Sequence, residues 1–464
     1  KIRHFAIFHE RATRGVFSRC MGVGAVACCS SDPLTALPVT VDLHFDAVVI
    51  GGGLGGLSAL RALRCAGRNA ILLTEGKLGD GQTLKCNGWV HRGYFQAFLS
   101  APLAKRWWEL TSELELAGLH GTGEALLSVP AATFEMTRAI FDVNDMPYEM
   151  VRQERGQTTV KCADIIFDKV GWVKQLAEGM GDHIAINASV RGLERVSNMW
   201  DVTCSFGGRL VTLQSQVVVV AAGTGNRNVL AGVRPALSLS QIRPHHQVRP
   251  VHMFLVRGPR ELLGTSSTIV MRPGFAPLVI GCNSEDRDTT VLCVTPHPWA
   301  PQPKVSPAHA QWTRDKCAGD GAWSPQMEVQ PDYARDCLEA LFEEQPHLME
   351  DPRVSFAAYG CMRQDANWDA SPMQVHLSKV DSCPNLMVLN IQFVGLLLAA
   401  GEAVAARVRE AGIWPNGSGR IPCAVGEARL AQAIGRPEET KGKLNWLPLH
   451  EFAQSVGVTL TKDG

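Results

Sequence analysis

The sequence predicts an α/β fold with two parts: a discontinuous domain of parallel strands and helices that includes a β-meander, and an α+β domain with a mainly antiparallel sheet. Three observations carry this prediction. Apolar runs at 45–50 and 70–73 flank a helical pattern, which is the strand–helix–strand order of a parallel sheet. Strand-like runs at 184–190, 200–204 and 209–213, with a Gly-rich turn between the last two, indicate the meander. Further runs between residues 248 and 295, separated by Gly, Pro and Asp, indicate the antiparallel sheet.

The composition excludes several classes of protein. Of the 464 residues, 45% are hydrophobic and 19% are charged, so the chain can bury sizeable cores and is expected to fold. The 45 Lys and Arg residues balance 45 Asp and Glu residues, and no net charge attracts a nucleic acid. The chain has no uninterrupted run of about 20 apolar residues, which a membrane-spanning helix needs. We therefore expect neither a nucleic-acid partner nor a transmembrane segment.

Cysteine and histidine usage gives no sign of a metal site. The 14 cysteines are scattered and include no Cys-x-x-Cys pair, so zinc ribbons and thioredoxin-like motifs are unsupported. Reduced thiols in a cytoplasmic protein are the expected state. His245, His246 and His252 are close in the chain, but no acid or cysteine completes a metal-ligand spacing.

Both ends of the chain are expected to lie outside the main fold. Residues 1–43 show no clear periodicity and are interpreted as a disordered extension. Residues 1–40 hold five Lys or Arg and two acidic residues, which is loosely typical of an organelle-targeting segment, so that location stays open as an alternative. Residues 413–464 form a C-terminal tail to which the sequence assigns no role.

The strongest local signal follows the first apolar run. Gly51, Gly53 and Gly56 form the pattern G-x-G-x-x-G and open a helical pattern that stops near Gly67. The first glycine permits a tight turn, the second lets a pyrophosphate approach the backbone, and the third lets helix and strand pack closely. The second apolar run ends at Glu75, 19 residues after Gly56, where a carboxylate would accept hydrogen bonds from a ribose diol. These features predict a dinucleotide site, and the acid makes NADP the weaker choice.

The segment after Glu75 indicates which dinucleotide binds. It reads Gly81-Gln82-Thr83-Leu84-Lys85-Cys86, followed by Asn87-Gly88-Trp89-Val90-His91-Arg92-Gly93. It resembles the FAD-dependent oxidoreductases of the D-amino-acid oxidase superfamily, which includes glycine and sarcosine oxidases, glycerol-3-phosphate dehydrogenase and 2-hydroxyglutarate dehydrogenase. The hydroxy-acid branch of that superfamily often reads N-S-G-x-I-H-x-G, and the present segment is similar to a shortened version. The resemblance implies a Rossmann-like FAD-binding domain and non-covalent FAD, with Thr83, Asn87 and Gly88 as cofactor contacts and Cys86 as a spectator.

A later segment resembles the adenine-binding part of the same superfamily. A helix is expected over residues 168–180, with Asp168 as its N-cap, and the meander follows it. In the superfamily the first strand of this meander presents its backbone to the adenine, which implies a cofactor contact near Val190.

Two more segments resemble the flavin-binding part. The apolar run 217–223 ends in Ala222 and Gly223 and is similar to the second FAD motif of the superfamily. Near the C-terminus, a strand leads through Gly395 and Leu396 into a helix expected over 397–410. The resemblance implies that the N-terminus of this helix stabilises negative charge on the flavin pyrimidine.

The order of these segments predicts the domain organisation. The FAD-binding domain would take residues 44–98, 162–235 and 354–412. The substrate domain would take residues 99–161 and 236–353, with its antiparallel sheet as the platform over the flavin.

Two residues are candidates for the chemistry. Because the flavin takes a hydride from carbon, the protein must orient that carbon and accept one proton. His91 is the candidate proton acceptor, and a hydrogen-bonded or solvent-exposed loop histidine is the alternative. Arg363 is the candidate for gripping a substrate carboxylate or phosphate. A structural ion pair or a flavin contact is its alternative, because Gln364 replaces the proline that follows this arginine in the superfamily.

These residues predict an FAD-dependent oxidase or dehydrogenase that takes a hydride from a small CH–OH or CH–NH donor, with a hydroxy acid favoured by the pattern around His91. A flavin monooxygenase-type enzyme is one alternative, although the region around Gly395 lacks the aspartate typical of that class. A non-catalytic flavoprotein is the other alternative, which the departures at Gln364 and Phe393 keep open. The sequence leaves the electron acceptor unspecified.

Overall fold

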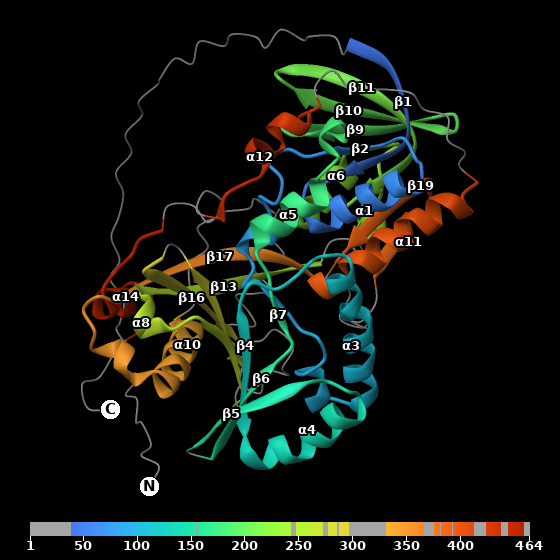
Figure 1. Ribbon diagram of the computed structural model, residues 1–464. Coiled ribbons are helices and arrows are strands. Elements are labelled where there is room, and N and C mark those ends of the chain that lie inside the picture. The colour runs from blue at the N-terminus through green and yellow to red at the C-terminus, as the bar shows by residue number, and fades with distance from the viewer. Residues whose placement is uncertain are drawn as a thin grey trace, which may run out of the picture.

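The computed structural model of the protein places two large sheets one above the other in the view of Figure 1, with helices packed against them. The structure describes residues 39–154, 156–242, 247–271, 277–284, 287–296, 331–365, 375–380, 382–391, 393–412, 424–437 and 444–458. The predicted fold class, an α/β part with a meander and an α+β part with a mainly antiparallel sheet, is confirmed.

The first sheet begins with the predicted strand–helix–strand unit: β1 (Val39–Ile50), α1 (Leu54–Cys65) and β2 (Ala70–Leu73). β1 and β2 run parallel. Alternate residues of β1 enter different cores, so that Val49 packs in the cluster that contains α1 and Val48 packs in the cluster that contains the meander. A strand that is buried on both faces needs apolar residues at every position, which explains the continuous apolar run.

The strands of the meander differ from the prediction in two places. Its strands are β9 (Ala188–Val196), β10 (Met199–Phe206) and β11 (Arg209–Val220). The run 184–190, expected as one strand, is divided between β8 (Ile184–Ala185), which pairs with β2, and β9, which pairs with β10. Asn187 turns the chain between them, with a positive φ of 53° that asparagine tolerates well.

The second correction concerns β11. The runs 209–213 and 217–223 were expected as separate strands, but residues 209–220 form one strand. Its polar middle stays in the sheet because Gln214 pairs with Asp201 of β10 on one side and with His44 of β1 on the other. β11 therefore belongs to the meander and to the parallel sheet at the same time.

The C-terminal part of the first sheet consists of β18 (His376–Val380) and β19 (Cys383–Asn390), followed by α11 (Leu397–Glu410). β19 runs parallel to β11. α11 packs on α1, where Ser58 Oγ donates a hydrogen bond to the carbonyl oxygen of Leu397 at 2.6 Å. This hydrogen bond joins residues 339 positions apart. It links α1 to α11, which lie side by side next to the first sheet.

The second sheet holds eight strands among the described residues, in the order β17, β13, β16, β15, β14, β4, β6, β5. In that order the strands are Ser355–Asp365, Gln247–Pro259, Thr289–Pro296, Leu278–Ser284, Ser266–Val270, Glu124–Pro130, Gln157–Cys162 and Tyr148–Glu154. Neighbouring strands are antiparallel except for β14 and β4, which are parallel. β17 is an edge strand of this sheet, although its residues fall in the segment 354–412 that was expected in the FAD-binding domain.

Three longer helices accompany the second sheet. They are α3 (Ala101–Leu116), α4 (Ala131–Val143) and α10 (Pro331–Glu344). α3 begins after Ser100, whose side chain accepts a hydrogen bond from Leu103 N at 3.3 Å, as an N-cap serine does. Phe134 on the inner face of α4 is fully buried against the sheet.

The remaining elements are short, η denoting a 3₁₀ helix. They are α2 (Gln82–Lys85), β3 (Trp89–Val90), η1 (Gln96–Phe98), β7 (Ile165–Ile166), α5 (Lys169–Ala177), η2 (Gly181–His183), η3 (Gly223–Gly225), α6 (Asn226–Ala231), β12 (Val233–Arg234), α7 (Leu239–Ile242), α8 (Arg260–Leu263), η5 (Pro346–Met349), η6 (Val394–Leu396), η7 (Glu427–Arg429), α12 (Leu430–Ala433) and α14 (Leu449–Ser455).

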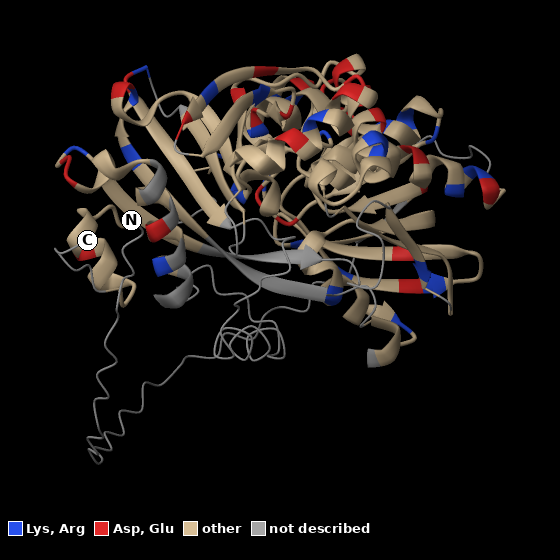
Figure 2. Cartoon of the chain, turned by 90° about the horizontal axis from the view of Figure 1, so that it is seen from below, with Lys and Arg blue, Asp and Glu red and all other residues tan. Residues whose placement is uncertain are grey.

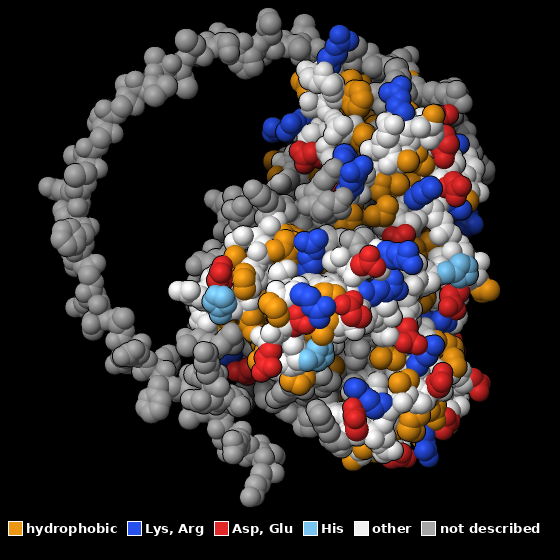
Figure 3. All heavy atoms as spheres, turned by 60° about the vertical axis from the view of Figure 1, so that its left-hand side comes forward, with side chains coloured by type: hydrophobic (Ala, Val, Ile, Leu, Met, Phe, Trp, Pro, Cys, Tyr) orange, Lys and Arg blue, Asp and Glu red, His pale blue; other side chains and the backbone are white. Residues whose placement is uncertain are grey.

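The surface matches the neutral composition. Lys and Arg residues lie among Asp and Glu residues along the described elements (Figure 2), and on the face drawn in Figure 3 basic side chains lie beside acidic ones. In the part of the chain that the structure describes, no helix combines the length and the apolar character needed to cross a lipid bilayer.

Candidate functional site

The predicted cofactor residues gather at one edge of the first sheet. Because β1, β2, β11 and β19 run parallel, their carboxyl ends meet at the same edge. Gly51 follows β1, Glu75 lies just beyond β2, Ala221 follows β11 and Asn390 ends β19. Ligands of open parallel sheets bind outside the carboxyl ends of the strands. This edge is therefore the candidate cofactor site.

Glycines shape the turn between β1 and α1. Gly51 has a φ of 122°, and a Cβ on it would lie 2.3 Å from the carbonyl oxygen of Ala221. A Cβ on Gly56 would lie 1.9 Å from the carbonyl oxygen of Gly51. A Cβ on Gly53, the N-cap of α1, would meet only Thr83 Oγ1 at 3.3 Å among the described atoms. The backbone at Gly53 is open beside a helix N-terminus, which fits the pyrophosphate of a dinucleotide.

A loop over residues 76–84, called here the pyrophosphate loop, closes the turn from the other side. Gly79 N donates to the carbonyl oxygen of Gly52 at 2.8 Å. Thr83, in α2, accepts a hydrogen bond on Oγ1 from Leu54 N at 3.2 Å. Because a hydroxyl group both accepts and donates, the Thr83 hydroxyl can also donate to a phosphate. The structure thus places Thr83 beside the glycine turn.

The predicted ribose and adenine contacts lie together. Glu75 is exposed just after β2, and its Oε1 accepts a hydrogen bond from Ser189 Oγ at 3.0 Å. Ser189 precedes Val190 in β9, where Val190 pairs with Cys204 next to a bulge in the meander. An exposed carboxylate that accepts this hydrogen bond on Oε1 keeps the capacity to accept hydrogen bonds from a diol.

The second predicted motif contacts the first. The Cα of Ala222 would lie 2.8 Å from a Cβ on Gly51, and Gly223 turns the chain with a φ of 58°. Three residues later, Asn226 Nδ2 donates to Asn390 Oδ1 at 2.9 Å, and both side chains are buried. This bond ties the chain that follows β11 to the end of β19.

Gly395 and Leu396 are buried in η6, directly before α11. A Cβ on Gly395 would lie 2.8 Å from the ring of Trp107, and that ring packs edge-on against Phe393 with centroids 5.4 Å apart. Phe393, which departs from the superfamily pattern, is therefore accommodated by aromatic packing. Trp107 is fully buried and serves as a packing residue here.

Asn87 and Gly88 lie where the two sheets approach each other. Gly88 has a φ of 80°, and its carbonyl oxygen accepts a hydrogen bond from Phe167 N at 2.9 Å. A Cβ on Gly281 of β15 would lie 2.6 Å from the carbonyl oxygen of Asn87. The predicted cofactor segment is therefore in direct contact with the second sheet.

His91 follows β3, which pairs with β7. Its side chain is buried, and Nδ1 lies 3.6 Å from Oδ2 of the buried Asp164. The same Oδ2 accepts a hydrogen bond from Trp89 Nε1 at 2.7 Å, and Oδ1 accepts one from Arg92 N at 2.7 Å. The rings of Trp89 and His91 also stack, with centroids 6.1 Å apart. The carboxylate is thus fixed in position against the imidazole.

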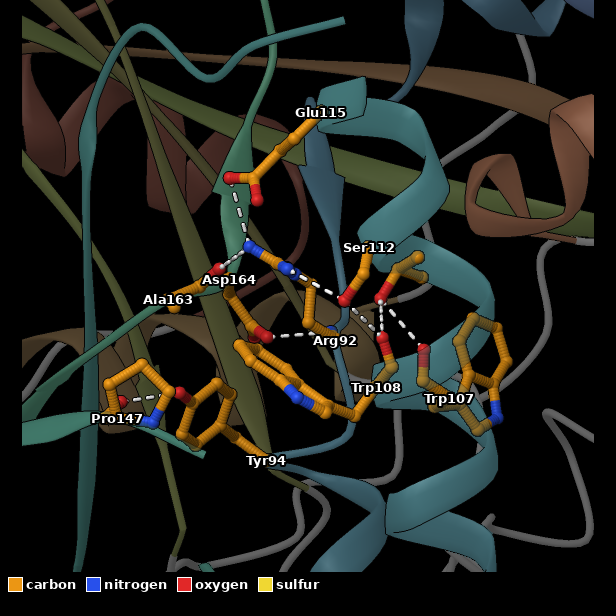
Figure 4. Close-up of polar contacts among 10 residues, drawn as sticks. Arg92, Tyr94, Trp107, Trp108, Ser112, Glu115, Pro147, Ala163 and Asp164 are labelled. Atoms are coloured by element: carbon orange, nitrogen blue, oxygen red, sulfur yellow. Dashed lines mark hydrogen bonds and ion pairs between the residues drawn. The ribbon is translucent and has the colours of Figure 1, made fainter. Parts of the chain in front are cut away.

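Arg92, whose backbone N–H donates to Asp164, is a structural residue, and Figure 4 shows its contacts. Its guanidinium lies 2.9 Å from Glu115 Oε1 and donates hydrogen bonds to the carbonyl oxygen of Ala163 and to Ser112 Oγ, both at 3.2 Å. It also lies over the ring of Trp108, 4.2 Å from the centroid. Its charge is engaged inside the protein, so Arg92 is not a candidate for binding a substrate anion.

Tyr94 lies in the same network (Figure 4). Its hydroxyl donates to the carbonyl oxygen of Pro147, and burial raises its pKa. The hydroxyl therefore stays protonated at neutral pH and acts as a packing residue with a fixed hydrogen bond.

The side chains of several predicted residues are not described by the structure. Arg363 lies in β17, where its backbone pairs with Arg249 of β13, but the side chain is not described. The same holds for Gln364 and His252, and the structure does not describe His245 or His246 at all. Among the described residues, no group of three His, Cys, Asp or Glu side chains is placed to hold a metal ion.

Asp164 and Asn390 belong to the site but were missed in the sequence. Asp164 lies 72 residues after Arg92, and Asn390 lies 164 residues after Asn226. Neither residue is part of a motif, so only the folded arrangement reveals its partner.

Comparison with known proteins agrees with this arrangement. The model of the family described as FAD dependent oxidoreductase matches residues 46–407, a range that includes all the predicted cofactor residues. A probable FAD-dependent oxidoreductase from Pseudomonas aeruginosa is 26% identical over 240 residues, which make up 46% of this chain and 59% of that protein.

Solved structures share the fold. The crystal structure of that Pseudomonas aeruginosa protein is 20% identical, with a TM-score of 0.55 over 82% of this chain and 95% of that one. The L-α-glycerophosphate oxidase of Mycoplasma pneumoniae, solved with FAD bound, is 13% identical, with a TM-score of 0.54 over 82% of this chain and 98% of that one. Glycine oxidase from Geobacillus kaustophilus is 14% identical, with a TM-score of 0.51 over 80% of this chain and 94% of that one.

Proposed function

Because the chain belongs to the family of FAD dependent oxidoreductases, we propose that it is an oxidase or dehydrogenase that oxidises a small hydroxy acid, with FAD as the hydride acceptor. The family and the cofactor agree with the sequence-based predictions. The observation that carries the choice of substrate is the buried pair of His91 and Asp164.

FAD would bind without a covalent bond at the carboxyl edge of the first sheet. The proposed contacts are Gly51, Gly53, Gly56, Glu75, Thr83, Asn87, Gly88, Val190, Ala222, Gly223, Gly395 and Leu396. The open backbone at Gly53 would take the pyrophosphate, and Glu75 would take the ribose diol. Cys86 donates its thiol to the carbonyl oxygen of Thr83 at 3.1 Å, which agrees with a spectator role.

The domain organisation follows the two sheets. We propose an FAD-binding domain of residues 39–98, 162–235 and 366–412, and a substrate domain of residues 99–161 and 236–365. The first residue is moved from 44 to 39 because residues 39–43, expected in the N-terminal extension, belong to β1, which pairs with β11. The second boundary is moved from 353 to 365 because β17 pairs with β13 in the second sheet.

His91 and Asp164 would manage the proton of the reaction. Bound FAD supplies the acceptor for the hydride that leaves the substrate carbon. The hydroxyl of the donor must lose its proton as the C=O bond forms, and His91 would accept that proton. Asp164 faces Nδ1, so the opposite nitrogen, Nε2, would be the atom that accepts the proton. The products are an oxo acid, reduced FAD and protonated His91, which balances two electrons and two protons.

This proton requirement favours a hydroxyl donor over an amine. An amine in its neutral form can lose a hydride without a base, because its lone pair stabilises the cation that forms. A hydroxyl donor needs a proton acceptor, and a buried histidine held by a carboxylate is suited to that task. The fold alone leaves the choice open, because glycine oxidase and glycerophosphate oxidase both share it. Arg363 is proposed to bind the carboxylate of the donor.

The test is anaerobic reduction of the flavin by matched pairs of donors. Lactate and alanine, glycolate and glycine, and 2-hydroxyglutarate and glutamate each differ only in hydroxyl against amine at the reacting carbon. We expect loss of the oxidised flavin absorbance with at least one hydroxy acid and not with its amino partner. Reduction by the amino partner alone would refute the substrate assignment. Reduction only by NADPH would indicate a monooxygenase, and reduction by none of the donors would support a non-catalytic flavoprotein.

A further inference from the structure

The chain beyond the family match is anchored on both sheets. Residues 424–437, with η7 and α12, lie on the first sheet, and residues 444–458, with α14, lie on the second (Figure 1). The family model matches residues 46–407 and therefore ends before both segments. The first of the two segments, residues 424–437, is called the brace below.

The brace forms hydrogen bonds to the turn that precedes β8. Oε1 of Glu427 accepts a hydrogen bond from Gly179 N, and Oε2 accepts one from Gly181 N, both at 3.0 Å. Gly426 N donates in return to the carbonyl oxygen of Gly181 at 3.0 Å. A carboxylate that accepts two backbone N–H groups forms charge-assisted hydrogen bonds, which are stronger than neutral ones.

The brace also pairs with the pyrophosphate loop. Leu78 N donates to the carbonyl oxygen of Ala433, and Gly435 N donates to the carbonyl oxygen of Leu78, both at 2.8 Å. Leu78 is fully buried and packs in one cluster with Leu430 and Ile434 of the brace. Both the polar backbone and the apolar side chain of Leu78 therefore depend on the brace.

The same loop contacts the cofactor cradle on its other side. The residue after Leu78 is Gly79, whose N–H donates to the carbonyl oxygen of Gly52 in the glycine turn. The space between brace and loop is tight, because a Cβ on Gly435 would lie 2.1 Å from Asp80 Oδ1. The pyrophosphate loop is thus held between the glycine turn and the brace.

The second segment, residues 444–458, is anchored on β17 of the second sheet. Phe356 of β17 exchanges two backbone hydrogen bonds with Leu447, at 2.8 and 2.9 Å. Phe452 of α14 is buried and stacks on Phe356, with ring centroids 5.9 Å apart. Residues 438–443 alone separate the two anchored segments, which limits how far the brace can move from the loop.

We propose that the brace keeps the pyrophosphate loop closed on the glycine turn and thereby raises the affinity of the protein for FAD. Glu427 is the positioning residue that fixes the brace. The inference rests on the proposed placement of FAD at the glycine turn. Coupling between two sites is reciprocal, so bound FAD must also strengthen the docking of the brace.

The first experiment uses the unmodified protein. Hydrogen–deuterium exchange is compared between the apoprotein and the FAD-loaded protein, with peptides that cover the pyrophosphate loop and the brace. We expect both peptides to exchange several-fold more slowly with FAD. Slower exchange in the loop alone would overturn the proposed role of the brace, but it would still agree with FAD binding at the glycine turn. Slower exchange in neither would overturn the placement of FAD and, with it, the brace.

The second experiment separates affinity from stability. The dissociation constant of FAD and the melting temperature of the apoprotein are measured for Glu427→Ala and Glu427→Gln. Glu451→Ala, which changes an exposed residue of α14, is the matched control. We expect the dissociation constant to rise about tenfold for the alanine variant, less for glutamine, and not at all for the control. A lower melting temperature with an unchanged dissociation constant would mean a merely structural role and would overturn the proposal.

Discussion

The imidazole Nδ1 of His91 and the carboxylate Oδ2 of Asp164 lie 3.6 Å apart, and both side chains are buried. The carboxylate is held by the indole of Trp89 and by the backbone of Arg92. Since a buried carboxylate is costly unless it is hydrogen-bonded, this arrangement orients the histidine at little loss of stability. The proposed choice of a hydroxy acid as substrate rests on this pair.

Asp164→Asn should slow flavin reduction by a hydroxy acid. The amide keeps a carbonyl oxygen for Arg92 N, but it carries no negative charge to stabilise the protonated imidazole, whose Nδ1 lies 3.6 Å from the carboxylate. We expect the rate constant to fall about 10²-fold while the affinity for FAD is retained, because general base catalysis contributes about that much. Anaerobic stopped-flow absorbance gives the rate. Asp142→Asn, the same change at an exposed residue, is the control, and equal rates for both variants would exclude Asp164 from the proton pathway.

Gly56→Ala should abolish FAD retention. The new Cβ would lie 1.9 Å from the carbonyl oxygen of Gly51, so the turn and helix must separate, at a cost of about 1–3 kcal/mol in the free energy of unfolding. Gly81→Ala is the matched control, since its Cβ would meet no described atom within 4 Å. Thermal unfolding and the flavin content after gel filtration check both variants. A yellow, stable Gly56→Ala protein would contradict the tight turn.

Glu75→Gln should weaken FAD binding. The neutral amide retains one acceptor but loses the charge that strengthens hydrogen bonds to a ribose diol, so we expect the dissociation constant to rise about tenfold. Ser189→Ala removes only the hydroxyl that contacts Glu75 and should have a smaller effect. Titration of the apoprotein with FAD, followed by flavin fluorescence, measures both. Equal affinities of Glu75→Gln and the unmodified protein would remove Glu75 from the site.

Cys282 should react slowly with alkylating reagents at neutral pH. Burial raises the pKa of its thiol to about 11, and only the thiolate is nucleophilic. Labelling with iodoacetamide should therefore increase steeply as the pH rises from 8 toward 11. Peptide mapping by mass spectrometry compares it with the exposed Cys65. Equal labelling of the two residues at pH 8 would show that the Cys282 thiol is not shielded.

Local patterns in the sequence predicted the elements that bind the cofactor. The glycine turn, the strand before it and the acid after β2 lie within about thirty residues, so their spacing alone determines how they meet. The helix α11 and its start were also predicted, because the apolar period and the preceding Gly395 are local signals.

Long-range contacts could not be predicted in this way. The partner of His91 depends on the pairing of β3 with β7, and the partner of Asn226 depends on β19 lying beside β11. Neither pairing can be predicted from the spacing of residues in the sequence. β17 was assigned to the wrong sheet for the same reason, because an apolar strand fits either sheet and only its register with β13 decides.

The contact between Ser58 and Leu397 also has a consequence for biosynthesis. These residues are 339 positions apart, and α11 covers the apolar face of α1 that they share. A ribosome synthesises the chain from its N-terminus, so α1 is made long before its partner helix exists. The first sheet and its helices therefore cannot be completed until 339 further residues have been translated after Ser58, and until then α1 exposes leucines on which nascent chains can aggregate.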